Sequence, residues 1–369
     1  MLEYLEIEGY KSIKELKIEL RPINILIGSN GAGKSNFISF FKLLRAIFNQ
    51  RLQRFVLEEG KADNLLYFGR KTTKELYGSV YFRDDHDKVA GYGFRLVPSK
   101  EGRLFFSNEG IGKNLEPFKF GDGLTLVASY TEESEASREL YKSPEQVRQS
   151  IKNIIQYHFN DTTATSAIRK ESEINDNRYL KHDGSNLAAM LYYLKVKHPI
   201  VFKRIEKTVR RVAPFFNEFI LEPDRLNERL IELRWNETDD PDSNFGASQF
   251  SDGTIRFIAL ATLLMQPEPP AVTIIDEPEL GLHPMAINLL AGMIQSATPK
   301  TQLIISTQSA SLVDQFEPED IITVDRSRTE KQSVFHRLDK DRLSRWLSDH
   351  TLGDLWERNI FNAAQPFKI

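Results

Sequence analysis

The chain has 369 residues, of which 49 are Lys or Arg and 52 are Asp or Glu, so its formal net charge is −3. This balance excludes a uniformly basic nucleic-acid coat protein but leaves a local basic patch open, and the 40% hydrophobic content is typical of a globular chain. Because the sequence contains no cysteine, it excludes disulfides, thiolate metal sites, iron–sulfur clusters and cysteine nucleophiles.

The first hundred residues predict strands around one helix. Residues 15–20 alternate polar and apolar side chains, as in a strand with one buried face, whereas residues 23–27 are almost continuously apolar, as in a strand buried on both faces. An amphipathic helix should follow, with an apolar stripe from Phe37 to Phe48. Residues 76–108 then predict a meander of three strands separated by turn residues.

The stretch from about 130 to 213 changes character and predicts helices. Ser143–Gln146 has the form of a capping box with proline at the first helical position. Two further helices are expected at residues 186–197 and 200–212, and Pro214 should stop the second one.

Strands and helices alternate from residue 230 to near the end of the chain. The expected strands are residues 230–235, 272–275, 302–306 and 321–324, and the expected helices are residues 253–265 and 284–296. Alternation of this kind predicts an α/β sheet.

The segment Gly28–Ser35 fits the phosphate-binding pattern G-x-x-x-x-G-K-[ST] and lies between an expected buried strand and a helix, as this loop requires. Its glycines let backbone N–H groups turn toward phosphates, and the helix N-terminus adds partial positive charge. Lys34 is expected to reach the β- and γ-phosphates and Ser35 to coordinate Mg²⁺. A chance match in a glycine turn is the alternative. The residues expected to contact a nucleotide are Asn30, Gly31, Ala32, Gly33, Lys34, Ser35 and Asn36.

The apolar strand expected at residues 272–275 ends in two carboxylates, Asp276 and Glu277. An acidic residue at the end of a buried strand faces the crevice in which α/β proteins bind ligands. Asp276 fits the Mg²⁺ ligand of a P-loop NTPase, and Glu277 fits the catalytic base or positioner of the attacking water. The alternative is an acidic strand end at a solvated turn, and the P-loop elsewhere in the chain weakens that interpretation.

A second anion site is expected 25 residues before Asp276. Phe250–Thr254 precedes a helix, and Ser251 as N-cap with Gly253 beside it forms a helix start that can bind an anion. This segment resembles the signature motif of ABC-class ATPases, in the form found in the RecF, SMC and OLD group. In that class the motif binds the γ-phosphate held by the other subunit. An ordinary helix N-cap is the alternative.

Two more segments resemble the same group. Glu277–Pro284 is similar to its Glu-Pro-Glu and Gly-Leu-His-Pro run, which touches the partner subunit in ABC ATPases, so His283 is expected at an interface or in a local hydrogen bond rather than on a metal. Residues 303–309 resemble the switch strand and loop, with Gln308 where most ABC ATPases have histidine. Glutamine can hydrogen-bond the γ-phosphate but cannot ionise near neutral pH, so Gln308 predicts intact binding with slow turnover. A plain loop glutamine is the alternative.

The resemblance implies the fold class, an α/β ABC-type ATPase head with a P-loop core, an antiparallel β meander and a compact helical insertion. We therefore expect an N-terminal ATPase lobe at residues 1–130, the helical insertion at 131–213 and a C-terminal ATPase lobe at 214–369. The resemblance also implies ATP and Mg²⁺ as cofactors, and a homodimer or higher homo-oligomer that sandwiches two nucleotides between subunits.

The function that the resemblance implies is ATP-driven dimer closure with hydrolysis, in the regulatory or sensor subunit of a DNA-maintenance or anti-phage defence complex. The alternative is a scaffold with little turnover that holds a separate effector nuclease or toxin. An ABC-transporter motor fits less well, because the 217 residues from Lys34 to Ser251 exceed the spacing typical of that core. An intrinsic nuclease is least expected, because the chain ends soon after the switch strand and leaves no space for a TOPRIM domain.

The segment from Lys195 to Arg211 is a local basic surface that could contact nucleic-acid phosphates or an acidic partner. It holds seven Lys or Arg residues and one acid, Glu206, around an apolar helical stripe, and a solvated helix face is the alternative. No apolar run reaches the length of a membrane span, and the N-terminus lacks a secretory pattern. We therefore expect a cytoplasmic protein with no membrane contact.

Overall fold

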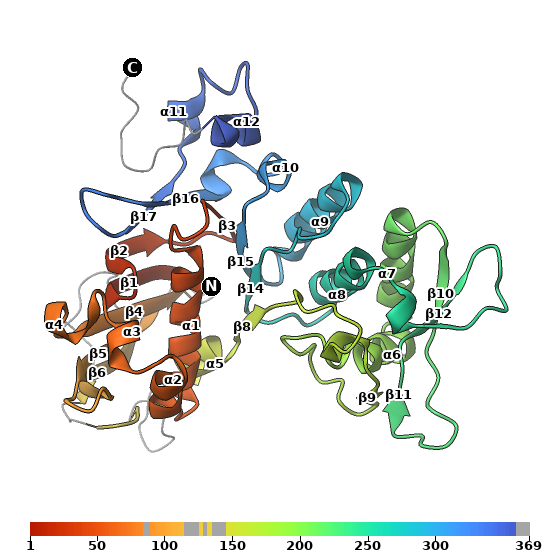
Figure 1. Ribbon diagram of the computed structural model, residues 1–369, viewed down its shortest axis with the longest axis horizontal. Coiled ribbons are helices and arrows are strands. Elements are labelled where there is room, and N and C mark those ends of the chain that lie inside the picture. The colour runs from red at the N-terminus through yellow and green to blue at the C-terminus, as the bar shows by residue number, and fades with distance from the viewer. Residues whose placement is uncertain (84–86, 88, 114–124, 128–130, 135–144, 359–369) are drawn as a thin grey trace. The chain divides into compact units, whose positions relative to one another are not determined.

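The computed structural model of the chain describes residues 1–83, 87, 89–113, 125–127, 131–134 and 145–358 (Figure 1). The chain forms two compact units: unit 1 is Met1–Gln156 with Glu317–Ile369, and unit 2 is Tyr157–Phe316. This division differs from the three consecutive segments expected from the sequence, because the last part of the chain returns to the unit that holds the N-terminus. The helix start expected at Ser143 lies outside the described residues, and α5 (Glu145–Lys152) follows it.

Unit 1 contains an antiparallel sheet with the strand order β2-β1-β4-β5-β6-β7. Its strands are β1 (Leu2–Tyr10), β2 (Ile13–Glu19), β4 (Leu76–Arg83), β5 (Val89–Pro98), β6 (Leu104–Lys113) and β7 (Thr125–Val127). The alternating pattern of β2 buries Leu16 and Ile18, while the lysines and glutamates of the strand stay exposed. The meander expected at residues 76–108 is confirmed as β4, β5 and β6.

A second strand group of unit 1 carries the P-loop. β3 (Ile23–Ile27) is buried along its whole length, as its continuous apolar sequence predicts. It pairs in parallel with β16 (Ile321–Arg326), which pairs antiparallel with β17 (Ser333–Arg337).

The helix α1 (Lys34–Phe48) follows β3 and packs on the antiparallel sheet. Phe40 of α1 stacks on Phe94 of β5, with ring centroids 6.1 Å apart. The apolar stripe of α1 therefore anchors the helix, and with it the end of the P-loop. The remaining helices of unit 1 are α2 (Leu52–Glu58), α3 (Ala62–Leu65), α4 (Gly69–Thr72), α11 (Lys340–Leu343) and α12 (Leu352–Glu357).

Unit 2 is built around a group of packed helices (Figure 1). Its helices are α6 (Leu187–Lys197), α7 (Pro199–Val212), α8 (Asp252–Met265), α9 (Pro284–Ala297) and α10 (Ala310–Val313). α7 contacts α6, α8 and α9, and α8 contacts α9. Every residue of α8 from Thr254 to Leu264 is buried, so α8 is the central helix of this group.

The strands of unit 2 confirm most of the expected pattern. β14 (Val272–Asp276) and β15 (Gln302–Thr307) pair in parallel, in register from Val272 opposite Gln302. The single strand expected at residues 230–235 is instead two strands, β11 (Leu230–Ile231) and β12 (Arg234–Glu237), which pair with different neighbours. The other strands are β8 (Ile154–Tyr157), which begins in unit 1, β9 (Ser172–Glu173), β10 (Phe216–Ile220) and β13 (Phe245–Gly246). No helix in the described part of the chain is long and apolar enough to cross a membrane.

Candidate functional site

The P-loop connects β3 to α1, and two of its glycines are required by their surroundings. Gly33 has a φ of +124°, and a Cβ there would lie 2.1 Å from the Ser333 Oγ. A Cβ on Gly28 would lie 2.2 Å from the carbonyl oxygen of Val324 in β16. The glycines therefore let β16 and β17 approach the loop closely, in addition to giving it its turn.

The loop leaves its anion-binding groups accessible. α1 has no side-chain N-cap, so the N–H groups of its first turn have no capping acceptor. Asn30, Gly31 and Ser35 are exposed, whereas Lys34 is only 6% exposed. The Lys34 Nζ donates to the carbonyl oxygens of Gly28 and Ser29, the latter over 3.3 Å, so the ammonium group lies inside the loop. This arrangement fits a nucleotide phosphate with its Mg²⁺.

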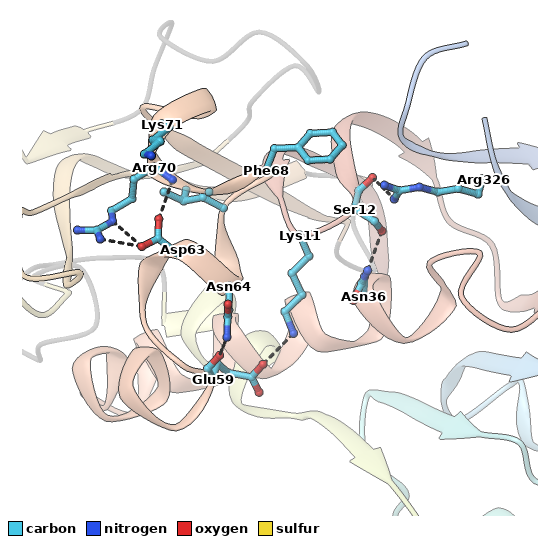
Figure 2. Close-up of a pocket in the computed structure, with 12 residues that line it drawn as sticks. Lys11, Ser12, Asn36, Glu59, Asp63, Asn64, Phe68, Arg70, Lys71 and Arg326 are labelled. Carbon is cyan, nitrogen blue, oxygen red and sulfur yellow. Dashed lines mark hydrogen bonds and ion pairs between the residues drawn. The ribbon is translucent and has the colours of Figure 1, made fainter. Parts of the chain in front are cut away.

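A hydroxyl and amide network that the sequence did not predict holds the loop in place, and Figure 2 shows its contact between Asn36 and Ser12. The Asn36 Nδ2 donates to the Ser12 Oγ over 2.7 Å. The Ser333 Oγ lies 2.7 Å from the Ser12 Oγ and 2.5 Å from the carbonyl oxygen of Ala32. Ser12 lies in the turn after β1, and Ser333 is the first residue of β17, 321 residues later in the chain. No local sequence motif identifies either serine.

A cavity of about 750 Å³ lies beside the first turn of α1 (Figure 2). Asn36, Ser12 and Phe68 line it together with four cations and two acids: Lys11, Arg70, Lys71, Arg326, Glu59 and Asp63. Lys11 pairs with Glu59 over 2.8 Å and Arg70 pairs with Asp63 over 2.7 Å, and the hydrogen bonds from Arg70 lower the pKa of Asp63 to about 2. Two cations remain in excess, which favours an anionic or strongly polar occupant.

In unit 2 the structure brings Gln308, predicted in the switch loop, to the acidic pair Asp276 and Glu277. Asp276 ends β14, and Glu277 follows it in the left-handed region with a φ of +47°. The Glu277 N–H donates to the carbonyl oxygen of Ser306 in β15 over 2.9 Å. The Ser306 Oγ donates to the Asp276 Oδ1, and the Gln308 Nε2 donates to the Glu277 Oε1. The switch glutamine therefore contacts the expected catalytic base directly.

Glu279 is a further member of this cluster to which the sequence assigned no role. Its Oε1 accepts hydrogen bonds from the Thr307 Oγ1 and, over 3.3 Å, from the Gln308 N–H. Its Oε2 is buried and has no hydrogen-bond partner. Burial raises the pKa of Glu279 above its ordinary value, although the Thr307 hydrogen bond opposes this. The second glutamate of the Glu-Pro-Glu run was the available signal.

The signature segment begins α8 and packs on the segment that follows the acidic pair. The Thr254 N–H donates to the Ser251 Oγ over 3.2 Å, which confirms Ser251 as the N-cap. A Cβ on Gly253 would lie 2.4 Å from the carbonyl oxygen of Gly281. Only glycine lets these two segments lie this close together.

Two arginines with buried side chains hold these segments: Arg256 contacts the segment after the acidic pair, and Arg169 contacts the signature segment. Arg256 of α8 donates to the carbonyl oxygens of Leu280 and, over 3.0 Å, Phe159. Arg169, whose side chain is 5% exposed, donates to the carbonyl oxygen of Phe250 over 2.9 Å and pairs with Asp252 over 2.9 Å. No sequence motif identifies either arginine.

The expected Mg²⁺ ligands lie in different units, Ser35 in unit 1 and Asp276 in unit 2. Among the residues that the structure describes, no group of three or more His, Asp or Glu residues could hold a metal ion by itself. His283 caps α9, since its Nδ1 accepts from the Met285 N–H over 3.3 Å, and this local hydrogen bond is one of the two roles expected for it.

A comparison with known protein families gives a match over most of the chain. Residues 23–314 match the family described as "AAA domain, putative AbiEii toxin, Type IV TA system". No curated protein matches the sequence.

Two solved structures of SMC heads are similar over almost their whole length. A crystal structure of an SMC head bound to the C-terminal winged-helix domain of ScpA has a TM-score of 0.59 at 17% identity, covering 92% of this chain and 98% of that one. An SMC head with an extended coiled coil, bound to the C-terminal domain of ScpA from Pyrococcus furiosus, has a TM-score of 0.55 at 15% identity and covers 94% and 98%. Such distant similarity concerns the fold alone. Because the family match spans most of the chain, the protein belongs to this AAA-domain family, and its fold is that of an ABC-class P-loop ATPase head of the SMC type.

Proposed function

We propose that the chain binds and hydrolyses ATP with Mg²⁺. The P-loop carries this proposal, because it combines an uncapped helix N-terminus, the ammonium of Lys34 inside the loop and an exposed Ser35 hydroxyl. Lys34 and the loop N–H groups would hold the β- and γ-phosphates. The adjoining cavity, with its excess of two cations, is the place for the remainder of the nucleotide.

The acidic cluster of unit 2 supplies the groups that hydrolysis needs. Asp276 would hold Mg²⁺ together with Ser35, and the ion would neutralise charge on the phosphate oxygens. Glu277 would accept a proton from the attacking water. The hydrogen bond from Gln308 fixes the direction of the Glu277 carboxylate, and Glu279 fixes the backbone of Gln308.

The signature segment supports a dimer in which two copies enclose two nucleotides. Ser251 and Gly253 at the start of α8 would bind the γ-phosphate held by the second copy. This homodimer or higher homo-oligomer would be cytoplasmic. It would serve as the regulatory or sensor subunit of a DNA-maintenance or anti-phage defence assembly that also contains a separate effector protein. The family description, which names a toxin of a toxin–antitoxin system, and the ScpA-bound SMC heads support such a partnered role.

A nucleotide-stabilised scaffold with little turnover is the second candidate. Gln308 favours it, because an amide cannot take up or release a proton near neutral pH. Phosphate release by the wild-type chain at saturating ATP separates the two. A rate no higher than that of the Glu277→Gln variant establishes the scaffold, and a clearly higher rate establishes the ATPase.

Lys34→Ala tests nucleotide binding itself. Loss of the ammonium from the loop should weaken ATP binding by about 100-fold or more, since a charge-assisted phosphate contact is lost. Titration with a fluorescent ATP analogue measures the affinity. Lys42→Ala, which removes an exposed lysine from the same helix, is the matched control and should bind normally. If Lys34→Ala binds the ATP analogue with wild-type affinity, the P-loop is not part of the nucleotide site.

A further inference from the structure

Unit 2 contains a groove, remote in sequence from the P-loop, that none of the functions above uses. The groove has a volume of about 440 Å³ and is formed by α7, the end of α8, and α9 with the turn after it. Arg204, Thr208 and Arg211 line it from one face of α7, with the spacing of successive helical turns. Lys300 closes the α9 side.

The rim of the groove is positively charged and uncompensated. Arg204, Arg211 and Lys300 are exposed, and within the described ranges no carboxylate lies within 4.0 Å of any of them. No Asp or Glu lines the groove, and α9 carries no charged side chain between Pro284 and Ala297. Arg204 and Arg211, two cations of the basic segment Lys195–Arg211, therefore line the same groove.

The floor of the groove is apolar. Leu264 and Met293 are buried at its base and Leu289 is half-buried along its side. A Cβ placed on Gly292 meets no atom within 4 Å, so the floor is open at that position. A ligand must therefore offer an apolar surface to the base as well as negative charge to the rim.

The hydroxyls of the groove do not compete for that negative charge. The Thr208 Oγ1 donates to the carbonyl oxygen of Arg204 over 2.9 Å, and the Ser296 Oγ donates to that of Gly292 over 2.7 Å. The arginines and Lys300 thus supply the principal donors, and carboxylates or phosphates are the acceptors that match them.

The length of the groove selects the kind of occupant. Arg204 and Arg211 are seven residues apart, which is about 10 Å along a helix, so the rim offers its cations over two helical turns. A nucleic-acid duplex would place phosphates on the rim, but its bases are stacked inside and offer little apolar surface to the leucine and methionine floor. A helical segment with an apolar stripe and acidic flanks satisfies both features.

We propose that this groove docks an acidic amphipathic helix of a separate partner protein. The proposal does not rest on the ATPase function, because every lining residue lies in unit 2 and none belongs to the P-loop, the acidic cluster or the signature segment.

Binding of designed peptides to the full chain tests the proposal. The probe is a fluorescein-labelled helical peptide of about four turns, with leucines at helical spacing and glutamates on both flanks, followed by fluorescence anisotropy. The Arg204→Glu/Arg211→Glu double variant should weaken binding by about tenfold or more. Gly292→Leu should weaken it similarly by filling the open floor, without changing charge.

Lys203→Glu/Lys207→Glu is the matched control, since these exposed lysines lie on α7 but do not line the groove. It makes the same charge change on the same helix and should alter the affinity by less than about twofold at physiological salt. A fluorescent ATP analogue should bind all variants as it binds the wild type, which keeps this test separate from that of the ATPase.

Three outcomes would overturn the proposal. If the groove and control variants lose equal peptide affinity, the peptide is attracted by the general positive charge of α7 and not by the groove. Equal binding of a peptide with lysines in place of glutamates would remove the charge argument. Absence of peptide binding, or binding of a short duplex DNA that Arg204→Glu/Arg211→Glu abolishes while the peptide stays unbound, would assign the groove to another class of ligand.

Discussion

Glu277 has a backbone conformation that a glutamate rarely adopts. Its φ of +47° is unfavourable by about 1–2 kcal/mol for a residue with a Cβ. The hydrogen bond from its N–H to Ser306, together with that from Gln308 to its carboxylate, holds it there. Strain of this kind, held by several neighbouring contacts, is typical of positions that must aim one side chain in one direction.

Glu279→Ala tests the residue that supports Gln308. The change removes the acceptor for the Thr307 hydroxyl and the Gln308 N–H, so Gln308 loses its fixed position. We expect phosphate release to fall by about 10- to 100-fold, while ATP affinity changes by less than about threefold because the P-loop is intact. Steady-state phosphate release and ATP titration measure the two effects.

Glu279→Gln is the conservative partner of that variant. Its amide oxygen can still accept both hydrogen bonds, so it should keep most of the activity. If the alanine and glutamine variants lose activity equally, or if neither loses any, Glu279 does not position the switch loop.

At the scale of elements, a buried carboxylate ties α7 to β10. The Glu206 Oε1 accepts the Phe219 N–H over 3.0 Å, and burial raises the pKa of Glu206 above its ordinary value. Arg210 is 3.9 Å from the other oxygen and opposes this rise only weakly. The folded chain therefore binds a proton at Glu206 more readily than the unfolded chain does.

This pKa shift makes stability depend on pH in one direction. Between the ordinary carboxyl pKa and the raised one, the folded state holds more protons, so the free energy of unfolding decreases as pH rises through that window. Glu206→Gln removes this decrease while keeping an acceptor for Phe219. The stability of Glu206→Gln relative to wild type should therefore increase from about pH 4 to about pH 7 in thermal unfolding.

The matched control is Glu222→Gln, which neutralises an exposed carboxylate in the same part of unit 2. Its stability relative to wild type should change little over the same pH range. If the difference in stability between Glu206→Gln and the wild type does not change with pH, then the ionisation of buried Glu206 does not lower the free energy of unfolding.

Gly253→Ala tests the contact between α8 and the segment after the acidic pair. The added methyl would lie 2.4 Å from the Gly281 carbonyl oxygen, so one of the two segments must move, at a cost of about 1–3 kcal/mol. Gly292→Ala is the opposite case within α9, where the methyl meets nothing within 4 Å and should stabilise by about 0.5–1 kcal/mol. Chemical unfolding of both variants should give shifts of opposite sign. Equal stability of the two would argue against close packing at Gly253.

At the scale of the whole molecule, the candidate groups are divided between two units. The P-loop belongs to unit 1, whereas Asp276, Glu277, Gln308 and the signature segment belong to unit 2. In the proposed dimer, a nucleotide held by one copy and contacted by the second can favour the closed state through its higher affinity for that state.

If Glu277 is the base that we propose, Glu277→Gln should accumulate such a dimer with ATP, because the variant keeps an acceptor for Gln308 but cannot take up the proton. Light scattering should show about a doubling of mass on addition of ATP and Mg²⁺, and the Lys34→Ala/Glu277→Gln double variant should stay at its starting mass. An unchanged mass in Glu277→Gln would contradict the sandwich arrangement.

Most elements were predictable because their signals are local. β3 follows from five apolar residues, α1 from a periodic stripe, and Ser251 from the preference of serine for the start of a helix. The single strand expected at residues 230–235 was wrong, since the segment forms two strands, β11 and β12, which pair with different neighbours. A short stretch of sequence shows hydrophobic periodicity, but it does not show with which strand the segment will pair.

The sequence by itself predicted the P-loop, the acidic pair and the signature segment, because each is a short local run of residues, and the resemblance carried by these runs indicated the ABC class. Only the tertiary structure decided that Ser333 supports the P-loop, that Glu279 holds Gln308, that the last part of the chain joins unit 1, and that Arg204, Arg211 and Lys300 share one groove. Each of these depends on residues that are distant in the chain. Such contacts are fixed by the packing of whole elements, which no local pattern of residues specifies.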